Sequence, residues 1–214
     1  GTHAVTADGN VAVAALQDLE LFVGSGGFSA AAGTAVGVAN STLVDGLSIR
    51  DQVPQIEIAK GDGPCVLVFR VLATPSAEDL TSLEAFAAAH PVRIYLQEAG
   101  LETVRPLPGQ AVDLHYRLPD FGVQIHFEPT DFTQVNLELN RLMVRQAVDL
   151  LDPGPGERVL DLFCGLGNFT LPLARRAGLV VGVEGDAGLV ERARGNAQAN
   201  GINNVTFQVA DLYG

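Results

Sequence analysis

The sequence predicts an α/β protein in which an α+β unit with an antiparallel sheet precedes part of a parallel-sheet domain. Two observations lead to this prediction. Between residues 50 and 128, several β-rich segments surround one helical pattern, as in α+β units. From residue 158 onward strands and helices alternate, which is typical of a parallel sheet built by right-handed crossovers. A length of 214 residues is compatible with one large domain or two small ones.

The first 45 residues differ from the rest in composition. They are rich in Ala, Gly, Val and Ser, and no Lys or Arg occurs before Arg50. Short strands are expected at 11–16 and 20–23, but this composition lies between a weak β-segment and a flexible linker. We therefore leave the segment without an assigned structure.

Strand patterns and one helix fill the next part of the chain. Segments 55–59 and 64–71, joined by a GDG turn, predict an antiparallel hairpin. A helix of about three to four turns is expected next, because Ser76 and Asp79 have capping-box spacing. Further strands are predicted at 92–97, 111–118 and 123–128.

The second half of the chain begins with a predicted helix, 137–151. Asn136 is its expected N-cap, and Pro153, Gly154 and Pro155 end it. Its spacing places four apolar residues on one face: Leu139, Met143, Ala147 and Leu150. Beyond it we predict strands at 158–163, 179–184 and 204–209, and helices at 168–176 and 187–200.

The turn after the first parallel strand, DLFCGLGNFT at 161–170, is the predicted ligand site. Gly165 and Gly167 lack Cβ and let a nucleotide approach the backbone. A dinucleotide fingerprint would place a third glycine where Thr170 stands, so NAD and FAD are disfavoured. S-adenosylmethionine has no pyrophosphate and does not need that glycine. A nucleotide-dependent oxidoreductase stays open as a different class of enzyme.

Two acidic residues at strand ends complete the pattern. Glu184 ends the second parallel strand, where a carboxylate can accept hydrogen bonds from both ribose hydroxyls, or can simply be exposed. Asp211 follows the third strand and can accept from an adenine amino group, although Asp suits any loop. Together with the glycine turn, these residues predict S-adenosyl-L-methionine as the cofactor.

Four ordered segments carry a resemblance to a known family: FTQVN at 132–136, DLFCGLGNFTLPLA at 161–174, VVGVEG at 180–185 and ERARGNAQANGINNVTF at 191–207. Over residues 46–214 the chain resembles the RNA uracil-C5 methyltransferases, and most of all the branch that makes 5-methyluridine in large-subunit ribosomal RNA. The resemblance implies a central α+β domain at 46–130. It also implies the first half of a Rossmann-like S-adenosylmethionine methyltransferase domain at 131–214, and an RNA substrate, namely ribosomal RNA.

The resemblance further implies which residues line the cofactor site. With Gly165 and Gly167, they are Gln134, Phe163, Asn168, Glu184 and Asp211. Structural alternatives stay open for three of them. Gln134 is also placed to hydrogen-bond the start of a helix, Phe163 to be a core residue, and Asn168 to be a helix cap.

We expect the chain to contain no catalytic residue and to be inactive alone, or to be a non-catalytic cofactor- or RNA-binding fragment. In the family a thiolate adds to uracil C6, C5 attacks the sulfonium methyl group, and a base removes the C5 proton. The resemblance places that cysteine and base beyond residue 214. Cys164 matches the cofactor turn and has no His or Lys beside it to lower its pKa. Cys65 is expected to be a small buried residue within a strand.

Several further expectations follow from what the sequence lacks. The family's N-terminal RNA-binding barrel and four iron–sulfur cysteines are not found, which suggests a gene fragment, a frameshifted start or a fusion. No apolar run approaches the ~20 residues of a membrane span, and no secretory signal is seen. Because Cys65 and Cys164 cannot supply a disulfide framework, a reducing cytoplasm is the expected compartment. The oligomeric state stays open.

Charge and histidine spacing set the remaining expectations. The formal net charge of -12 argues against a simple electrostatic attraction to nucleic acid. No metal site is predicted, because the histidines do not approach each other at ligand spacing: His3, His90, His115 and His126. Some arginines are candidates for an RNA-facing surface, although such residues are often a solvated helix face: Arg93, Arg117, Arg141, Arg145, Arg175 and Arg176.

Overall fold

The computed structural model describes residues 4–7, 11–14, 43–134 and 136–212. The chain divides into two compact units, Gly1–Val112 and Asp113–Gly214. This division falls before the segment 113–130, which the sequence analysis assigns to the central domain. The domain limits given above stay a prediction. Among the described residues, no helix is both long enough and apolar enough to cross a membrane.

The first unit contains a mixed sheet in the order β3–β4–β5–β6. Its strands are β3 (Gln55–Lys60), β4 (Cys65–Arg70), β5 (Val92–Gln97) and β6 (Arg105–Pro106). The predicted β3–β4 hairpin is confirmed as antiparallel. The expected antiparallel sheet is wrong for one pair of strands, because β4 and β5 run parallel, whereas β5 and β6 are antiparallel. The helix between β4 and β5, α2 (Ala77–Ala89), carries the chain across the sheet, so the next strand enters in the same direction.

The core of this unit lies between its sheet and α2. β4 is buried from Cys65 to Phe69, and its alternate residues Cys65, Leu67 and Phe69 share one cluster with Leu83, Phe86 and Ala87 of α2. The described part of the N-terminal segment forms an antiparallel pair, β1 (Ala4–Ala7) and β2 (Val11–Ala14). The strand expected at 11–16 is thus confirmed for residues 11–14, whereas the strand expected at 20–23 lies outside the described residues.

Short 3₁₀ turns complete the described structure: η2 (Val44–Gly46), η3 (Arg50–Gln52), η4 (Leu101–Thr103) and η5 (Pro119–Phe121).

The predicted capping box of α2 is confirmed and is part of a larger hydrogen-bond network. The Asp79 carboxylate, only 3% exposed, accepts from the Ser48 backbone at 2.7 Å, the Ser48 hydroxyl at 2.6 Å and the Ser76 backbone at 2.9 Å. The Asp79 N–H donates in return to Ser76 Oγ at 3.1 Å. Burial by itself raises the pKa of this carboxyl, but the hydrogen bonds from Ser48 and Ser76 outweigh it and lower the pKa to about 2.

We expect Asp79→Asn to remove an acid-sensitive part of the stability of the first unit. Because the folded pKa lies below the usual 3.8, the ionised carboxylate stabilises the fold above that value. This contribution, about 2 kcal/mol, is lost as the pH falls toward the folded pKa. Denaturant unfolding at about pH 6 and about pH 3 measures it, with Glu78→Gln, an exposed acid of the same helical turn, as the control. A wild-type pH dependence retained by Asp79→Asn would contradict the assignment.

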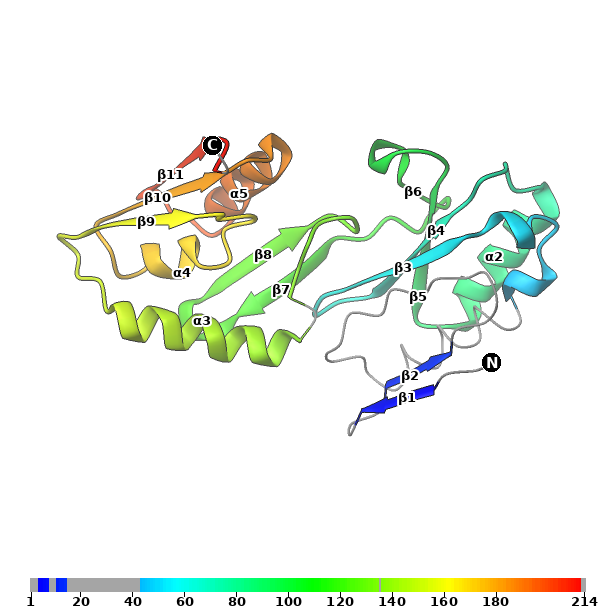
Figure 1. Ribbon diagram of the computed structural model, residues 1–214, viewed down its shortest axis with the longest axis horizontal. Helices are drawn as coiled ribbons and strands as arrows, with labels where there is room; N and C mark the ends of the chain where they lie inside the picture. Colours follow the sequence, from blue (N-terminus) through cyan, green and yellow to red (C-terminus); the bar gives the residue numbers. More distant parts are fainter. Residues whose placement is uncertain (1–3, 8–10, 15–42, 135, 213–214) are drawn as a thin grey trace. The chain divides into compact units, whose positions relative to one another are not determined.

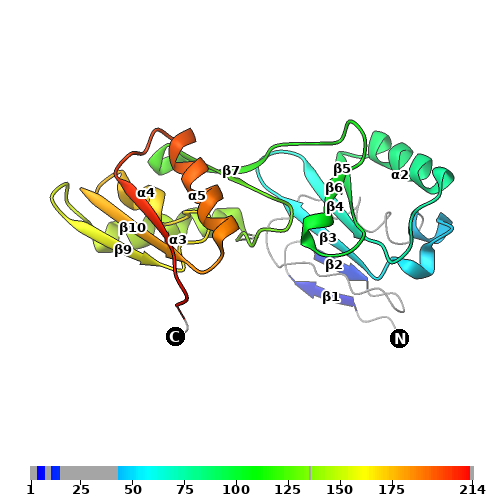
Figure 2. The same cartoon turned by 90° about the horizontal axis from the view of Figure 1, so that it is seen from above.

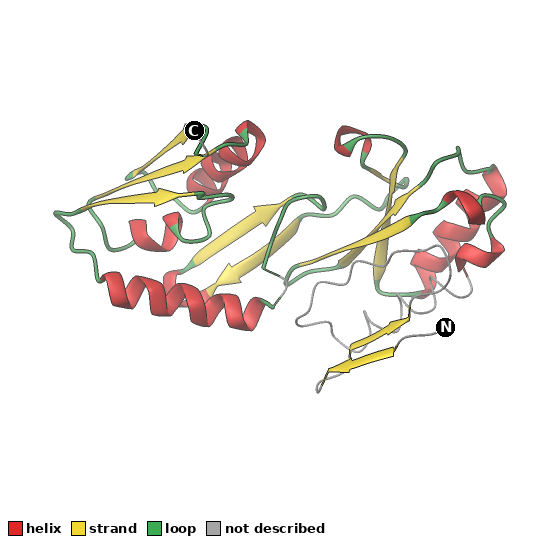
Figure 3. Cartoon of the chain, viewed as in Figure 1, coloured by secondary structure: helices red, strands yellow, loops and turns green. Residues whose placement is uncertain are grey.

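The second unit contains the predicted parallel sheet, in the order β11–β10–β9. Its strands are β9 (Arg158–Leu162), β10 (Leu179–Glu184) and β11 (Val205–Val209), and their arrows point the same way in Figure 1. The helices α4 (Thr170–Ala174) and α5 (Ala187–Ala199) connect them, and Figure 3 shows the alternation of strand and helix. The helix expected at 168–176 is shorter than predicted, because irregular turns extend to Phe169.

The long helix α3 (Leu137–Leu151) begins at its predicted N-cap but buries a different face. Asn136 Oδ1 accepts from the Leu139 N–H at 3.0 Å. The predicted apolar face is open to solvent, with Leu139 58% and Leu150 78% exposed. The buried positions are Asn140, Val144 and Val148. Helical spacing tells which side chains share a face, but it does not tell which face meets the rest of the unit.

A hairpin of β7 (Leu114–Leu118) and β8 (Val123–Phe127) is held to α5 by two asparagine side chains. Asn200 accepts from the Gln124 N–H at 2.8 Å and donates to its carbonyl at 2.7 Å. Asn196 does the same for His126, at 2.8 and 3.1 Å, and also donates to the Leu166 carbonyl at 3.2 Å. Since Leu166 lies in the glycine turn, α5 links the hairpin to that turn. Figure 2 shows α5 alongside β10 and β11.

Candidate cofactor-binding site

The turn after β9 has an unusual backbone. Phe163, Gly165 and Gly167 have positive φ angles of 59°, 51° and 93°. Glycine adopts this left-handed region without a steric penalty, whereas the same conformation at Phe163 is strained. A Cβ at Gly167 would lie 3.1 Å from Leu171 Cγ, but one at Gly165 would meet nothing within 4 Å. Gly167 is therefore needed for packing inside the protein, while Gly165 faces open space.

Glu184 lies beside this turn, as predicted for the end of the neighbouring parallel strand. Its Oε2 accepts from the Gly165 N–H at 3.1 Å. Its Oε1 accepts from the N–H groups of Gly185 at 2.7 Å and Asp186 at 3.2 Å. Three backbone donors thus fix the orientation of one carboxylate at the carboxyl edge of the sheet, where ligands of such sheets bind.

Neither Phe163 nor Asn168 has the purely structural role that the sequence left open, a core position for Phe163 and a helix cap for Asn168. Phe163 is 53% exposed, so it is not a core residue. Asn168 does not cap α4, whose N-cap is Phe169. Its amide pairs reciprocally with that of Asn140 at 2.9 and 3.0 Å, and its Oδ1 also accepts from the Tyr116 hydroxyl at 2.9 Å. Asn168 thereby joins the glycine turn to α3 and β7.

The partners Asn140 and Tyr116 are site residues that sequence reasoning missed. The sequence did contain one signal for Asn140: it is a polar residue on the same helix face as the apolar Val144 and Val148. It is 2% exposed, and its side chain has a partner because buried amides need one.

The last two predicted site residues flank other elements: Gln134 precedes α3 and Asp211 follows β11. Gln134 is exposed and precedes α3, whose first turn is capped by Asn136 rather than by Gln134. Asp211 is exposed and follows Ala210, whose N–H donates to the Glu184 carbonyl at 3.0 Å. This bond keeps the segment after β11 at the same sheet edge as Glu184. The hydrogen bonds that join Gly165 to Glu184 include neither Gln134 nor Asp211.

Thr170 stands where a dinucleotide fingerprint has its third glycine. Its side chain is fully buried, and its hydroxyl donates to Asp161 Oδ2 at 2.5 Å. Burial raises the pKa of the Asp161 carboxyl, and the bond from Thr170 opposes this shift. The strand and the helix that flank the turn are thus joined by a side-chain hydrogen bond instead of a glycine contact.

Both cysteines of the chain are buried and free. Burial raises the pKa of the Cys164 thiol to about 12, and the nearby Asp161 and Glu184 carboxylates add to this shift. Burial raises the pKa of the Cys65 thiol to about 11, although Lys60 opposes it. Since the thiolate is the reactive form, neither residue has the surroundings of a nucleophile.

The arginines considered for an RNA-facing surface have partners within the protein. Arg145 lies 3.6 Å from Asp120, and Arg176 lies 2.6 Å from Asp149. Arg175 donates to the carbonyls of Phe121, Gly122 and Asn200. These contacts favour the view that the arginines are solvated or structural residues over the view that they form an RNA-facing surface.

The expectation that no histidines approach each other is wrong for His115 and His126. They are direct partners in the β7–β8 hairpin, with ring centroids 5.6 Å apart. Ten residues lie between them along the chain, and the strand pairing brings them together.

A glycine turn, a carboxylate at the next strand end and a parallel sheet in this order are features of a Rossmann-like nucleotide-binding fold. The family model described as a methyltransferase domain matches residues 153–213. A 23S rRNA (uracil(1939)-C(5))-methyltransferase of Methylococcus capsulatus is 56% identical over 171 residues, 79% of this chain and 39% of that protein. The corresponding protein of Alkalilimnicola ehrlichii is 57% identical over 173 residues, 79% of this chain and 38% of its own length.

The predicted resemblance to the RNA uracil-C5 methyltransferases is thereby confirmed, and the chain is a sequence relative of their ribosomal branch. It spans about 39% of the length of these curated relatives. A solved structure, the Pyrococcus abyssi tRNA (uracil-54, C5)-methyltransferase in complex with S-adenosyl-L-homocysteine, aligns with a TM-score of 0.55 and 22% identity. This alignment covers 72% of this chain and 38% of that one. The likeness to that structure concerns the fold.

Proposed function

We propose that this chain is the cofactor-binding part of an enzyme that transfers a methyl group from S-adenosyl-L-methionine to uridine C5 in RNA. The observation that carries the proposal is the Glu184 carboxylate, fixed beside the Gly165 bend at the carboxyl edge of the parallel sheet. A carboxylate in this position is suited to bind the two hydroxyls of a ribose. The two sequence relatives named above, from Methylococcus capsulatus and Alkalilimnicola ehrlichii, are 23S rRNA methyltransferases, so ribosomal RNA is the proposed substrate class.

The hydrogen bonds of Glu184 set a condition on ribose binding. An ionised carboxylate has about four acceptor positions. Three are taken by the N–H groups of Gly165, Gly185 and Asp186. One acceptor position is therefore free, whereas two ribose hydroxyls need two. The second becomes available if the longest of the three bonds, from the Asp186 N–H at 3.2 Å, is given up, because it is the weakest. The site is oriented before the cofactor binds and needs only a local adjustment.

The other proposed contacts surround this carboxylate. The open space at Gly165 allows the cofactor to touch the backbone, and Gly167 keeps the turn tight. Phe163 presents an exposed ring from a strained backbone, a combination often found at functional sites. Asn168 has one amide hydrogen beyond its bond to Asn140. The proposed site comprises Gln134, Phe163, Gly165, Gly167, Asn168, Glu184 and Asp211.

We further infer that this chain alone does not complete the reaction. Addition to uracil C6 needs a thiolate, and burial keeps Cys65 and Cys164 in the thiol form at neutral pH. When bound, the cofactor supplies the methyl group on a positively charged sulfur. The residues of this chain bind and orient that cofactor, while the nucleophile and the base belong to other parts of the enzyme.

Two measurements on the purified chain test these inferences separately. Calorimetric titration with S-adenosylmethionine and S-adenosylhomocysteine should show one site per chain. Incubation with labelled S-adenosylmethionine and unmodified ribosomal RNA should yield no 5-methyluridine. A chain that binds neither compound would contradict the cofactor site, and a chain that forms 5-methyluridine would contradict its catalytic incompleteness. Enhanced NADH fluorescence on mixing would instead support an oxidoreductase.

A further inference from the structure

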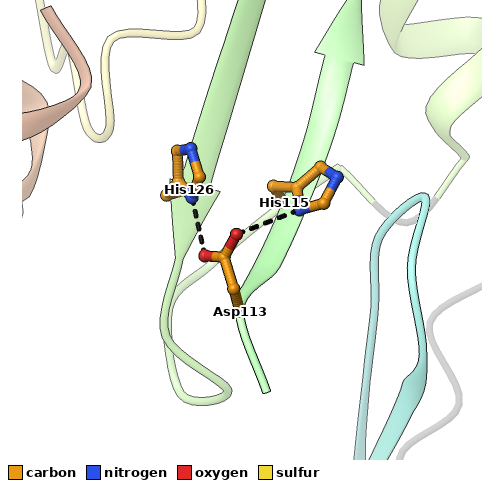
Figure 4. A group of neighbouring side chains, drawn as sticks. All are labelled: Asp113, His115 and His126. Atoms are coloured by element: carbon orange, nitrogen blue, oxygen red, sulfur yellow. Dashed lines mark hydrogen bonds and ion pairs between the residues drawn. The ribbon is translucent and has the colours of Figure 1, made fainter. Parts of the chain in front are cut away.

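Asp113, His115 and His126 form a cluster outside the cofactor site, on one face of the β7–β8 hairpin. His115 and His126 are cross-strand partners, so their side chains lie on the same face of the pair. Asp113 comes two residues before His115 and reaches both rings. Figure 4 shows its carboxylate between the two imidazoles.

The polar atoms of this cluster are close enough to surround one ion. His126 Nδ1 lies 2.6 Å from Asp113 Oδ1, and His115 Nδ1 lies 3.3 Å from Asp113 Oδ2. One ligand atom from each residue lies within 4.8 Å of the others. Ligands of a tetrahedral zinc ion, at about 2.0–2.2 Å from the metal, lie about 3.3 Å apart. Rotation of the exposed Asp113 carboxylate and small shifts of the two half-buried imidazoles would bring the three atoms to that spacing.

One nitrogen of the cluster, His115 Nδ1, is held only weakly. Among the described residues, the contact of the buried His115 Nδ1 is with Asp113 Oδ2 at 3.3 Å, and it lacks the geometry of a well-formed hydrogen bond. A buried polar atom with poor hydrogen-bond geometry gains less than a well-formed hydrogen bond gives. A bound cation would give this nitrogen a partner and would also balance the charge of Asp113.

We propose that Asp113, His115 and His126 form a binding site for a divalent transition-metal ion, with Zn²⁺ as the representative ion. Imidazole and carboxylate are ligands that zinc, nickel, copper and iron accept, whereas calcium and magnesium prefer oxygen alone. Three protein ligands leave at least one position for water. The ion fixes Asp113, the first residue of the second unit, to the hairpin that follows it.

Gln124 is the residue that supports this site from behind. Its Nε2 lies 3.0 Å from His126 Nε2, and Arg117 Nε lies 3.3 Å from its Oε1. Binding of the ion at His126 Nδ1 requires the proton to be on Nε2. The Gln124 amide must then turn its oxygen toward that proton, as carbonyl and carboxylate groups do behind metal-bound histidines, and in doing so it gives up its hydrogen bond from Arg117 Nε.

Zinc titration of the tag-free chain, by calorimetry after treatment with a chelator, tests the site. We expect one Zn²⁺ per chain, and an affinity reduced at least about tenfold in His115→Ala, His126→Ala and Asp113→Ala. His90→Ala in the first unit is the matched control and should bind as the wild type does. The His126→Ala variant should still fold, because Asn196 holds its backbone and not its ring. Circular dichroism checks this.

A second readout identifies the ligands directly. Co²⁺ in place of Zn²⁺ should give visible d–d absorption of a nitrogen and oxygen site, and this absorption should vanish in the His115→Ala, His126→Ala double variant. A wild-type chain that shows no saturable Zn²⁺ binding would overturn the proposal. The same conclusion would follow if the double variant kept wild-type affinity, because the three side chains would then be only a hydrogen-bonded bridge.

Discussion

Glu184→Ala is expected to weaken the binding of S-adenosylhomocysteine by more than about 100-fold, because two hydrogen bonds to a charged acceptor are lost at about 1.5–3 kcal/mol each. The substitution also removes the acceptor of the Gly165, Gly185 and Asp186 N–H groups. Glu184→Gln keeps one acceptor oxygen at this position, so its affinity should lie between those of the wild type and Glu184→Ala. Calorimetric titration of each variant measures the effect.

The control for this prediction is Glu191→Gln, which neutralises an exposed carboxylate on α5 that pairs with Arg194. It changes the net charge of the second unit by the same amount as Glu184→Gln. Glu191→Gln should bind S-adenosylhomocysteine as the wild type does. If Glu184→Gln and Glu191→Gln had the same affinity, no specific role of Glu184 would be left, and the assignment of Glu184 to the ribose would be contradicted.

Gly165→Ala is expected to reduce cofactor affinity by at least about 100-fold while the fold persists, because a Cβ would occupy the space that the nucleoside needs. Within the protein itself this Cβ meets nothing within 4 Å. The cost to stability is therefore limited to the left-handed backbone, φ 51°, at about 1 kcal/mol. Thermal unfolding and calorimetry on the same sample separate the two effects.

Gly201→Ala provides a matched control in the same unit. Gly201 has φ 63° and also has nothing within 4 Å of a Cβ, so its variant carries the same backbone strain away from the sheet edge. We expect equal losses of stability in the two variants and a loss of affinity in Gly165→Ala only. Unchanged affinity in Gly165→Ala would mean that the open space is not the cofactor position.

Local patterns predicted most of the secondary structure in the described part of the chain. The strand at 179–184 and the caps at Ser76 and Asn136 were correct because they depend on residues within one turn or one strand. The glycine turn was predictable for the same reason, since its conformation is set by residues 165 and 167. The position of Glu184 followed from the rule that parallel strands end at one edge.

Errors arose where a contact depends on distant parts of the chain. The parallel pairing of β4 and β5 depends on how α2 crosses the sheet, and the buried face of α3 depends on Asn140 meeting Asn168. Likewise, Asn196 and Asn200 have helical spacing, but nothing local shows that they bind the backbone of β8.

The histidine cluster is the clearest case of a site that spacing along the chain conceals. His115 and His126 are adjacent only because the register of the hairpin pairs them. A predicted hairpin with a fixed register would have revealed this pairing, but the strand limits at 111–118 and 123–128 did not fix it. A register shifted by one residue would place the two rings on opposite faces.

The central claim is that the bend at Gly165 and the Glu184 carboxylate together hold the sugar of S-adenosylmethionine. A crystal structure of the chain with S-adenosylhomocysteine tests it most directly. The predicted result is a ribose with both hydroxyls within hydrogen-bond distance of the Glu184 oxygens and a nucleoside in contact with the Gly165 backbone. A ligand seated elsewhere on the chain, with Glu184 still bound only by its three backbone donors, would contradict it.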